Sequence, residues 1–174
     1  MRSPRQRWES WVTRRRIRRF VKGCRERIFP PVLDVGAGYR SNFREVQVKP
    51  YHTLDRNPDL EPTYVGDVRN MSMIPDKSYG TVLCTEVLEH VEDPLIALRE
   101  IHRVLTDTGL LIVTVPFWYP IHEKSYQRDY WRFTPRGLRS LLNQGLFLTT
   151  MVESAGSRIR PTGVFAMAWK GEGA

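Results

Sequence analysis

Two glycines and several acidic residues in the first part of the chain have the spacing of a nucleotide site. Gly36 and Gly38 directly follow a short apolar segment, and such glycines form a tight turn that a ligand can approach closely. Asp55 ends the next apolar segment, nineteen residues after Gly36, where an acid accepts hydrogen bonds from ribose hydroxyls. Asp67 follows a third segment, where an adenine amino group could be bound. The spacing predicts a cofactor that carries adenosine with a free ribose.

The motifs around these glycines narrow the choice of cofactor. A dinucleotide fingerprint needs a third glycine where Ser41 stands, and the Gly-x-x-x-x-Gly-Lys-Ser/Thr motif of a P-loop is absent from the sequence. A dehydrogenase is therefore disfavoured. Acids on three successive strand ends suit a cationic ligand better than a pyrophosphate. S-adenosylmethionine carries a sulfonium and an ammonium, and we expect it to be the cofactor.

A second group of chemically active side chains follows the clearest apolar segment, in residues 116–133. Long loops at the carboxyl end of a parallel sheet are commonly binding loops or lids. We expect His122 to act as a general base, with His90 and Asp129 behind it, because a neutral histidine suits that role near pH 7. The alternative for His90 is an ordinary histidine on a helix surface.

The aromatic and charged residues of the same loop predict an acceptor site. The candidate acceptor-binding residues are Trp118, Tyr130 and Arg132. Flat aromatic surfaces with hydrogen-bonding groups suit a sugar ring or an aromatic ring. The alternative is that the aromatic side chains only pack the loop and that Arg132 pairs with Asp129.

Strands and helices that alternate along the chain must position these groups. Predicted strands cover residues 32–35, 51–55, 63–67, 79–85, 109–115, 146–152 and 163–169. Helical periodicity covers residues 93–105, with Asp93 as N-cap, and a second helix starts at Thr134. This alternation predicts an α/β fold with a mostly parallel, doubly wound sheet.

The charge of the chain lies in one segment. The 174 residues carry a net charge of +8, of which residues 1–29 contribute +9 and residues 30–174 contribute −1. Apolar residues at three- and four-residue steps make residues 1–29 a basic amphipathic helix, followed by a globular domain over residues 30–174. We expect its apolar stripe to pack on the domain; a helix at a membrane surface and a cleaved organellar presequence are the alternatives.

Composition excludes several other classes of protein. Apolar residues make up 41% and charged residues 26%, which rules out wholesale disorder. No window is apolar enough to span a membrane, and Cys24 and Cys84 cannot build a disulfide framework. No Cys/His cluster has zinc spacing, so no metal is predicted. We expect a location in the cytoplasm, with peripheral contact at the inner membrane surface as an option through residues 1–29.

Four ordered motifs in residues 32–91 resemble those of the class I S-adenosylmethionine-dependent methyltransferases. They are VLDVGAG at 32–38, LD at 54–55, GDV at 66–68 and CTEVLEHV at 84–91. They look most like the small-molecule type 11 group, and residues 75–79 and 98–105 match as well. The resemblance implies a Rossmann-like, seven-stranded sheet in the order 3-2-1-4-5-7-6, with the last strand antiparallel.

The resemblance also implies roles for individual residues. Toward the methionine part of the cofactor it places Asp34, Gly36, Gly38 and Glu86, and toward the ribose and adenine it places Asp55, Arg56, Asp67 and Val68. Two positions depart from the family pattern. Arg40 replaces the last glycine of the glycine loop, and Gly80 stands where the family has an acid before the fourth strand.

A shorter similarity concerns the acceptor. Pro120-x-His122 and residues 129–138 resemble methyltransferases of bacterial polysaccharide and glycosyl-transfer pathways, which implies a hydroxyl on a small molecule or glycan. An RNA methyltransferase that uses the basic helix is one alternative. The Asn-Pro-Pro-Tyr type of motif is absent after the fourth predicted strand, which argues against a nucleic-acid partner. A non-catalytic binding module with the same fold is the other alternative function.

Overall fold

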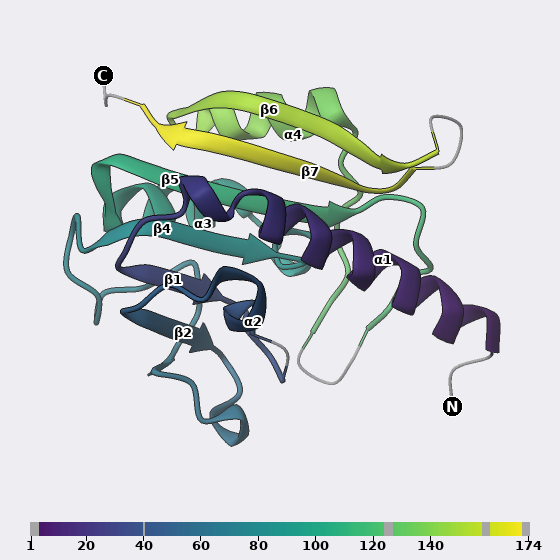
Figure 1. Cartoon of the computed structure of the whole chain (residues 1–174), viewed down its shortest axis with the longest axis horizontal. Coiled ribbons are helices and arrows are strands. Elements are labelled where there is room, and N and C mark those ends of the chain that lie inside the picture. Colours follow the sequence, from purple (N-terminus) through teal and green to yellow (C-terminus); the bar gives the residue numbers. More distant parts are fainter. Residues whose placement is uncertain (1–3, 40, 124–126, 158–160, 172–174) are drawn as a thin grey trace.

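The computed structural model describes residues 4–39, 41–123, 127–157 and 161–171, with the side chains from residue 13 onward (Figure 1). Its strands are β1 (Val32–Val35), β2 (Tyr51–Asp55), β3 (Tyr64–Val65), β4 (Tyr79–Thr85), β5 (Leu105–Pro116), β6 (Phe147–Gly156) and β7 (Pro161–Lys170). Its helices are α1 (Pro4–Gly23), α2 (Phe43–Val46), α3 (Pro94–Val104) and α4 (Pro135–Gln144), with short 3₁₀ turns η1 (Arg25–Arg27), η2 (Pro58–Leu60) and η3 (Leu88–His90).

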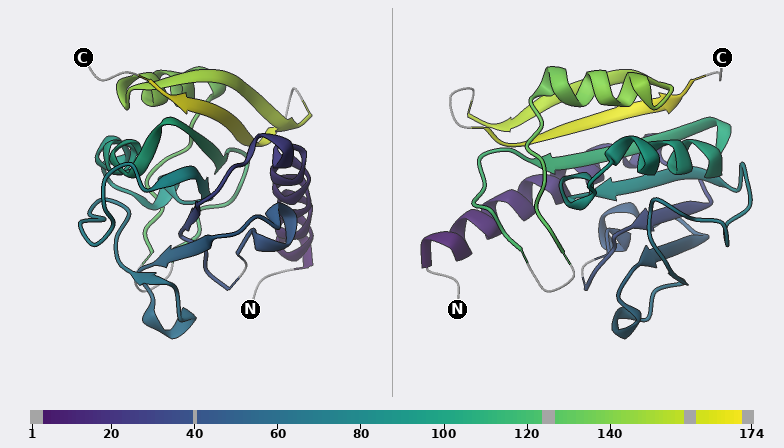
Figure 2. Two further views of the ribbon diagram at one scale, coloured as in Figure 1. Left: turned by 60° about the vertical axis from the view of Figure 1, so that its left-hand side comes forward. Right: turned by 180° about the vertical axis from the view of Figure 1, so that it is seen from behind.

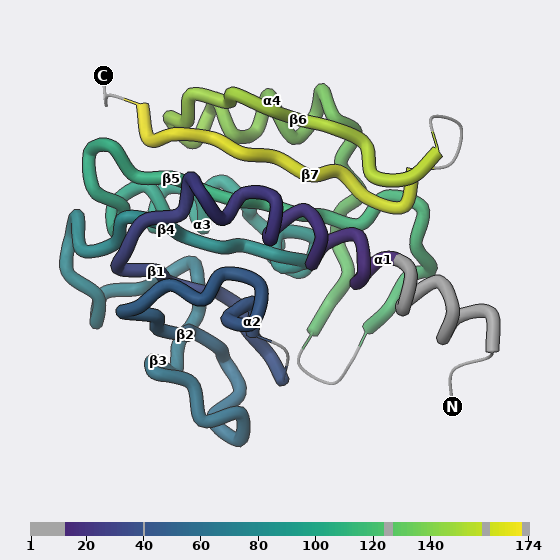
Figure 3. The backbone as a smooth tube through the Cα atoms, viewed as in Figure 1, coloured from purple at the N-terminus to yellow at the C-terminus, as the bar shows by residue number. Residues whose placement is uncertain are grey.

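The strands form one sheet in the order β3-β2-β1-β4-β5-β7-β6, which can be followed in Figure 3. β1 runs parallel to β2 and β4, and the pairs β2–β3 and β4–β5 are also parallel. β7 runs antiparallel to both β5 and β6. The Rossmann-like fold expected from the sequence, including the antiparallel last strand, is confirmed.

Apolar side chains cover both faces of the sheet. On one face, Ile17 and Val21 of α1, with Cys24 directly after it, are buried in a cluster with Leu83 and Ile112 of the central strands. α3 and α4 cover the opposite face, as the rear view in Figure 2 shows. The described part of the apolar stripe of α1 therefore packs on the sheet, as expected; the side chains of residues 4–12, Trp8 and Trp11 among them, lie outside the description.

Two predicted helix starts have the expected caps. The carboxylate of Asp93 accepts a hydrogen bond from the N–H of Leu95 at 3.0 Å, ahead of α3. The hydroxyl of Thr134 accepts one from the N–H of Gly137 at 3.0 Å, ahead of α4. Each cap satisfies an N–H that has no partner inside its helix.

Several boundaries differ from those predicted. β5 begins at Leu105 rather than 109, because Leu105 already pairs with Tyr79 of β4. β3 has two residues rather than five, and the one-turn helix α2 was not predicted. Within the described chain, the helices lack the combination of length and apolar character that a membrane-spanning segment requires.

Candidate active site

A pocket of about 460 Å³ opens at the carboxyl ends of the parallel strands. Its walls include seven of the eight residues expected to hold the cofactor: Gly36, Gly38, Asp55, Arg56, Asp67, Val68 and Glu86. Strands β1, β2 and β4 are neighbours in the sheet, so the loops that follow them meet at one edge. This is the crevice in which open α/β sheets bind ligands.

The glycine turn has the backbone that its residue types require. Gly36 and Gly38 adopt φ values of +64° and +56°, a left-handed conformation that costs other residues about 1–2 kcal/mol. A Cβ on Gly36 would also lie 2.5 Å from Cγ2 of Val87. Asp55 holds the turn, since its Oδ2 accepts a hydrogen bond from the N–H of Gly38 at 2.9 Å. Arg40, the predicted departure in this loop, lies outside the described residues.

The structure corrects the expectation for Asp34. Its side chain is fully buried and is not among the described residues that line the pocket. Its Oδ2 accepts hydrogen bonds from the N–H of Asn42 at 2.8 Å and from the hydroxyl of Tyr51 at 2.6 Å. Burial raises the pKa of Asp34 to about 6, although the bonds from Tyr51 and Asn42 act in the opposite direction. Asp34 anchors the segment that follows the glycine turn instead of facing the pocket.

Asp67 is paired with arginines at the pocket wall. Arg69 donates to it from Nε at 3.1 Å and from Nη2 at 2.8 Å, and Nη1 of Arg56 lies 3.6 Å from Oδ2. Burial would raise the pKa of Asp67, but the bonds from Arg69 outweigh it and the pKa is lowered. Arg69 also lines the pocket and was not predicted, because a single arginine two residues after an acid carries no distinctive signal.

Glu86 lines the pocket and comes directly after β4. It adopts a left-handed φ of +56°, and its Oε1 accepts a hydrogen bond from the hydroxyl of Thr114 on β5 at 3.1 Å. Burial raises the pKa of Glu86 to about 7, and the bond from Thr114 and the charge of Arg132 moderate the rise. A carboxylate in this position is stabilised by a cationic ligand.

The three expected catalytic residues lie together beside Glu86. The rings of His90 and His122 are 4.9 Å apart and nearly perpendicular. Asp129 contacts His122 twice: its Oδ2 accepts a hydrogen bond from the backbone N–H at 2.9 Å and lies 3.1 Å from Nδ1 of the ring. His90 also lines the cofactor pocket. The arrangement places one imidazole at the pocket and a second one next to it, oriented by a carboxylate.

Arg132 holds Asp129 in place. Its guanidinium donates to both carboxylate oxygens, with an Nη2–Oδ2 distance of 2.7 Å. Burial would raise the pKa of Asp129, but the bonds from Arg132 and from the N–H of His122 lower it to about 2. Arg132 therefore has the structural pairing that we considered as an alternative to acceptor binding.

The two aromatic candidates for acceptor binding are exposed. Trp118 is 59% and Tyr130 45% exposed, and neither is among the described residues that line the cofactor pocket. Neighbouring Trp131 packs on η3, where its Nε1–H donates to the carbonyl of Val91 at 2.9 Å. Trp118, Tyr130 and Arg132 stay predictions as acceptor-binding residues.

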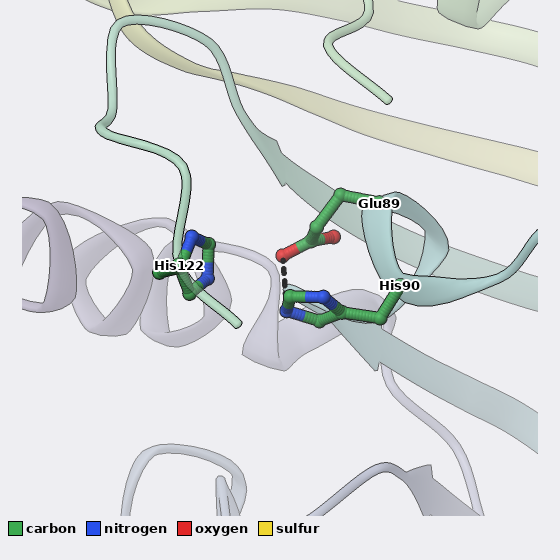
Figure 4. Close-up of side chains that lie close together, drawn as sticks. All are labelled: Glu89, His90 and His122. Carbon is green, nitrogen blue, oxygen red and sulfur yellow. Dashed lines mark ion pairs between the residues drawn. The ribbon is translucent and has the colours of Figure 1, made fainter. Parts of the chain in front are cut away.

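Glu89 is a member of the cluster that sequence reasoning missed. Its side chain is fully buried, and within the described residues neither carboxylate oxygen has a hydrogen-bond partner. Its Oε1 lies 3.6 Å from Nε2 of His90, and Figure 4 shows this pair facing the ring of His122. Burial, and then the charge of Glu86, raise the pKa of Glu89 well above its usual range. One potential ligand atom from each of Glu89, His90 and His122 lies within 4.8 Å of the others.

Comparison with known proteins identifies the class. Residues 5–160 match the family model described as a methyltransferase domain, so the chain belongs to this family of methyltransferase domains. Its fold is that of solved S-adenosylmethionine-dependent methyltransferases. The comparison with curated proteins gives no match.

Solved structures share the fold at low sequence identity. One is 1,6-didemethyltoxoflavin-N1-methyltransferase of Burkholderia thailandensis with bound S-adenosylhomocysteine, at 17% identity and TM-score 0.71, over 89% of this chain and 78% of that one. Another belongs to a complex of the Haloferax volcanii Trm112 methyltransferase activator with a methyltransferase, at 15% identity and TM-score 0.73, over 96% of each chain. The [4+2]-cyclase SpnF matches at 16% identity and TM-score 0.72, over 90% of this chain and 82% of that one.

S-adenosylhomocysteine, the product of S-adenosylmethionine, is bound in the first of these structures, and the pocket of this chain suits such a cofactor. The turn at Gly36 packs closely against Val87, which also lines the pocket, because a Cβ on Gly36 would lie 2.5 Å from Cγ2 of Val87. Acidic side chains at the ends of β2 and β4, Asp55 and Glu86, line the same pocket, where the first can bind ribose hydroxyls and the second can face a cationic group.

Proposed function

We propose that this protein transfers the methyl group of S-adenosylmethionine to a hydroxyl of a small molecule or glycan. The observation that carries the proposal is the His90–His122–Asp129 cluster beside the cofactor pocket, with a ring separation of 4.9 Å between the two histidines. A hydroxyl must lose its proton as it is methylated, whereas a neutral amine needs no base before it attacks. Two imidazoles beside the pocket therefore suit a hydroxyl acceptor.

The residues of the chain then have distinct tasks. The cofactor supplies an electrophilic methyl group on a positively charged sulfur. Asp55 and the glycine turn hold its nucleoside part, and Glu86 faces its cationic end. His122 accepts the proton of the acceptor hydroxyl, and Asp129 fixes the orientation of the His122 ring. His90 packs between the pocket and His122, and aligning the two reactants accounts for much of the rate in such a reaction.

The acceptor proposed here is flat and rich in hydroxyl groups. Trp118 and Tyr130 offer exposed aromatic surface near the histidines, on which a sugar ring can stack. The resemblance of Pro120-x-His122 and residues 129–138 to methyltransferases of polysaccharide and glycosyl-transfer pathways favours the same class of acceptor, as does the resemblance of residues 32–91 to the type 11 group. A structural relative that acts on 1,6-didemethyltoxoflavin shows that the fold accommodates small molecules.

Residues 1–29 are proposed to act as a basic accessory element of the catalytic domain formed by residues 30–174. Its described cationic side chains include Arg18, Arg19, Lys22 and Arg27, all exposed. A row of exposed arginines and lysine favours peripheral contact with an anionic surface such as the cytoplasmic face of a membrane. We propose a cytoplasmic location with contact of this kind, and we do not propose a nucleic-acid substrate.

The proposal is tested by measuring S-adenosylhomocysteine release from a panel of free sugars, sugar nucleotides and small phenols. We expect turnover with a hydroxyl acceptor and a product methylated on oxygen. His122→Ala should reduce turnover by about 10²–10⁴-fold while cofactor binding is retained. His102→Ala is the matched control, because His102 lies away from the pocket and contacts the carbonyl of Gly171 at 3.0 Å. Full turnover by His122→Ala contradicts the base assignment, and a product methylated on nitrogen contradicts the hydroxyl acceptor.

A further inference from the structure

The carboxylate of Glu89 is left without hydrogen bonds within the described chain, although the ring of His90 lies 3.6 Å away and the charge of Arg132 is nearby. It is fully buried, and both of its oxygens lack hydrogen-bond partners. A buried charge without a partner is strongly unfavourable, and folded proteins keep one where it pairs, changes its protonation or binds a metal. Glu89 forms part of η3 and comes immediately before His90, so its position is fixed by the turn that also presents a histidine to the pocket.

The neighbours of Glu89 are the side chains that bind transition metals. Its Oε1 lies 3.6 Å from Nε2 of His90, and a ring nitrogen of His122 completes a set within 4.8 Å. Metal–ligand bonds of about 2.0–2.2 Å in a tetrahedral site place neighbouring ligand atoms about 3.3–3.6 Å apart. The Glu89–His90 distance already agrees with that spacing. The widest separation between ligand atoms, at most 4.8 Å, must shorten by about 1 Å to reach the tetrahedral spacing.

Both histidines are oriented as metal-binding histidines usually are. Nδ1 of His90 contacts the carbonyl oxygen of Arg128 at 2.5 Å, which directs Nε2 toward Glu89. Nδ1 of His122 lies 3.1 Å from Oδ2 of Asp129. A metal-binding histidine generally uses its second nitrogen to contact a backbone carbonyl or a carboxylate, which fixes the ring and raises its affinity for the ion.

The charges around the three side chains favour a divalent transition-metal ion. Glu89 is a buried carboxylate and Glu86 a half-buried one, while the nearby guanidinium of Arg132 is already paired with Asp129. A carboxylate with two imidazoles is a ligand set typical of Zn²⁺ and of iron(II), with further coordination positions open to water or substrate. Mg²⁺ prefers a site made of oxygen ligands alone.

We propose that Glu89, His90 and His122 together bind one divalent transition-metal ion of the Zn²⁺ type beside the cofactor pocket. The inference goes beyond the proposed function, because metal binding at these residues requires neither cofactor nor acceptor. With the ion bound, His122 is a ligand and no longer a base. A hydroxyl that coordinated the ion would be more acidic and would release its proton to solvent water, so no protein base would be needed.

The test uses Zn²⁺ itself, titrated into the full chain by calorimetry after treatment with a chelator and desalting. We expect one saturable equivalent on the wild type and a Zn²⁺-dependent rise in the unfolding temperature. Changing a residue that orients a metal ligand costs about 10–100-fold in affinity, which is the loss expected for Asp129→Asn. Glu89→Gln and His122→Ala remove ligands and should lose at least about 100-fold.

Three controls make the result decisive. Mg²⁺ should not produce the same saturable heat, and His102→Ala should bind Zn²⁺ like the wild type. Circular dichroism shows whether each variant is folded, and Glu89→Gln keeps the shape of the side chain. The absence of saturable Zn²⁺ binding, unchanged binding by Glu89→Gln, or an equal loss in His102→Ala would overturn the proposal. Cofactor binding measured on the same samples separates that outcome from a failure of the methyltransferase proposal.

Discussion

Replacing Tyr51 by phenylalanine tests how the segment after the glycine turn is held. The Tyr51 hydroxyl donates to Oδ2 of buried Asp34 at 2.6 Å, and the N–H of Asn42 donates to the same oxygen at 2.8 Å. Phenylalanine keeps the ring and its edge contact with Phe43, whose centroid is 5.2 Å away. The substitution therefore removes one short hydrogen bond to a buried carboxyl group, together with a long one of 3.5 Å that the Tyr51 hydroxyl accepts from Ser41.

The size of the effect depends on the charge of Asp34. The pKa of Asp34 is about 6 in the folded protein, so the group is ionised at pH 7.5 and protonated at pH 4.5. A hydrogen bond to a charged group contributes about 1.5–3 kcal/mol, and one between neutral groups about 0.5–1.5 kcal/mol. At pH 7.5 the loss corresponds to a fall in unfolding temperature of about 3–12 °C for a chain of this length.

The direction of the pH dependence follows from the raised pKa. A carboxyl group whose pKa is higher in the folded than in the unfolded protein contributes its full stability below about pH 4. That contribution is lost as the pH rises through about 6. Tyr51→Phe removes a bond that favours the ionised form, so its cost should be larger at pH 7.5 than at pH 4.5.

Urea denaturation of the wild type and the variant at both pH values measures this difference. Tyr39→Phe is the control, because Tyr39 is 85% exposed and its change should stay within about 0.5 kcal/mol. If Tyr51→Phe is as stable as Tyr39→Phe at pH 7.5, or if its cost is equal at both pH values, the assignment of an ionisable, tyrosine-bonded Asp34 is wrong.

Three further substitutions test individual contacts by thermal unfolding. Gly36→Ala should lower the free energy of unfolding by about 1–2 kcal/mol because residue 36 has a positive φ, and its Cβ should displace Val87 at the pocket wall. Unchanged stability and unchanged cofactor affinity would contradict the turn geometry. Gly80→Ala should lower the free energy of unfolding by about 1–3 kcal/mol, because its Cβ would lie 2.7 Å from the carbonyl oxygen of Phe29. Unchanged stability would refute that close approach. Arg103→Ala should cost about 2 kcal/mol or more, because Arg103 binds the carboxylate of Glu100 and two backbone carbonyls; a loss below 0.5 kcal/mol would contradict it.

The cofactor side of the fold was predictable because its signals are local. β1 covers Val32–Val35 as predicted, since Pro31 and Gly36 bound the apolar segment on either side. The residues after β1, β2 and β4 meet at one edge because parallel strands bring their carboxyl ends together. Asp34 was misplaced because its role was only what the resemblance implied, and the resemblance does not show that Tyr51, seventeen residues further along, binds this carboxyl group.

The glycine at position 80, where the family has an acidic residue, has a steric explanation that cannot be read from the sequence. The backbone of Phe29 and Pro30 crosses over this position, and a Cβ there would lie 2.8 Å from the carbonyl oxygen of Pro30. The chain that links α1 to β1 therefore occupies the space that an acidic side chain would need. This contact joins residues fifty positions apart, beyond the range of any local pattern.

The acceptor side of the candidate site was predicted only in part, because contacts between residues far apart in the sequence determine it. The loop of residues 116–133 lacks the periodicity that reveals a strand or helix. Its path is fixed by distant contacts, such as the bond from the N–H of Tyr130 to the carbonyl of Glu89 at 2.8 Å. These contacts bring His122 to His90 and Glu89, so the three-residue cluster became visible only in the fold.

The most direct test of the cofactor site is calorimetric titration of the wild type and Asp55→Ala with S-adenosylmethionine and S-adenosylhomocysteine. NAD serves as the control ligand, and Asp59→Ala, an exposed acid on η2, serves as the control variant. We expect micromolar binding by the wild type and by Asp59→Ala, and a loss of about 10- to 150-fold in Asp55→Ala. Failure of the wild type to bind either ligand, or equal affinity in Asp55→Ala, would contradict the site described above.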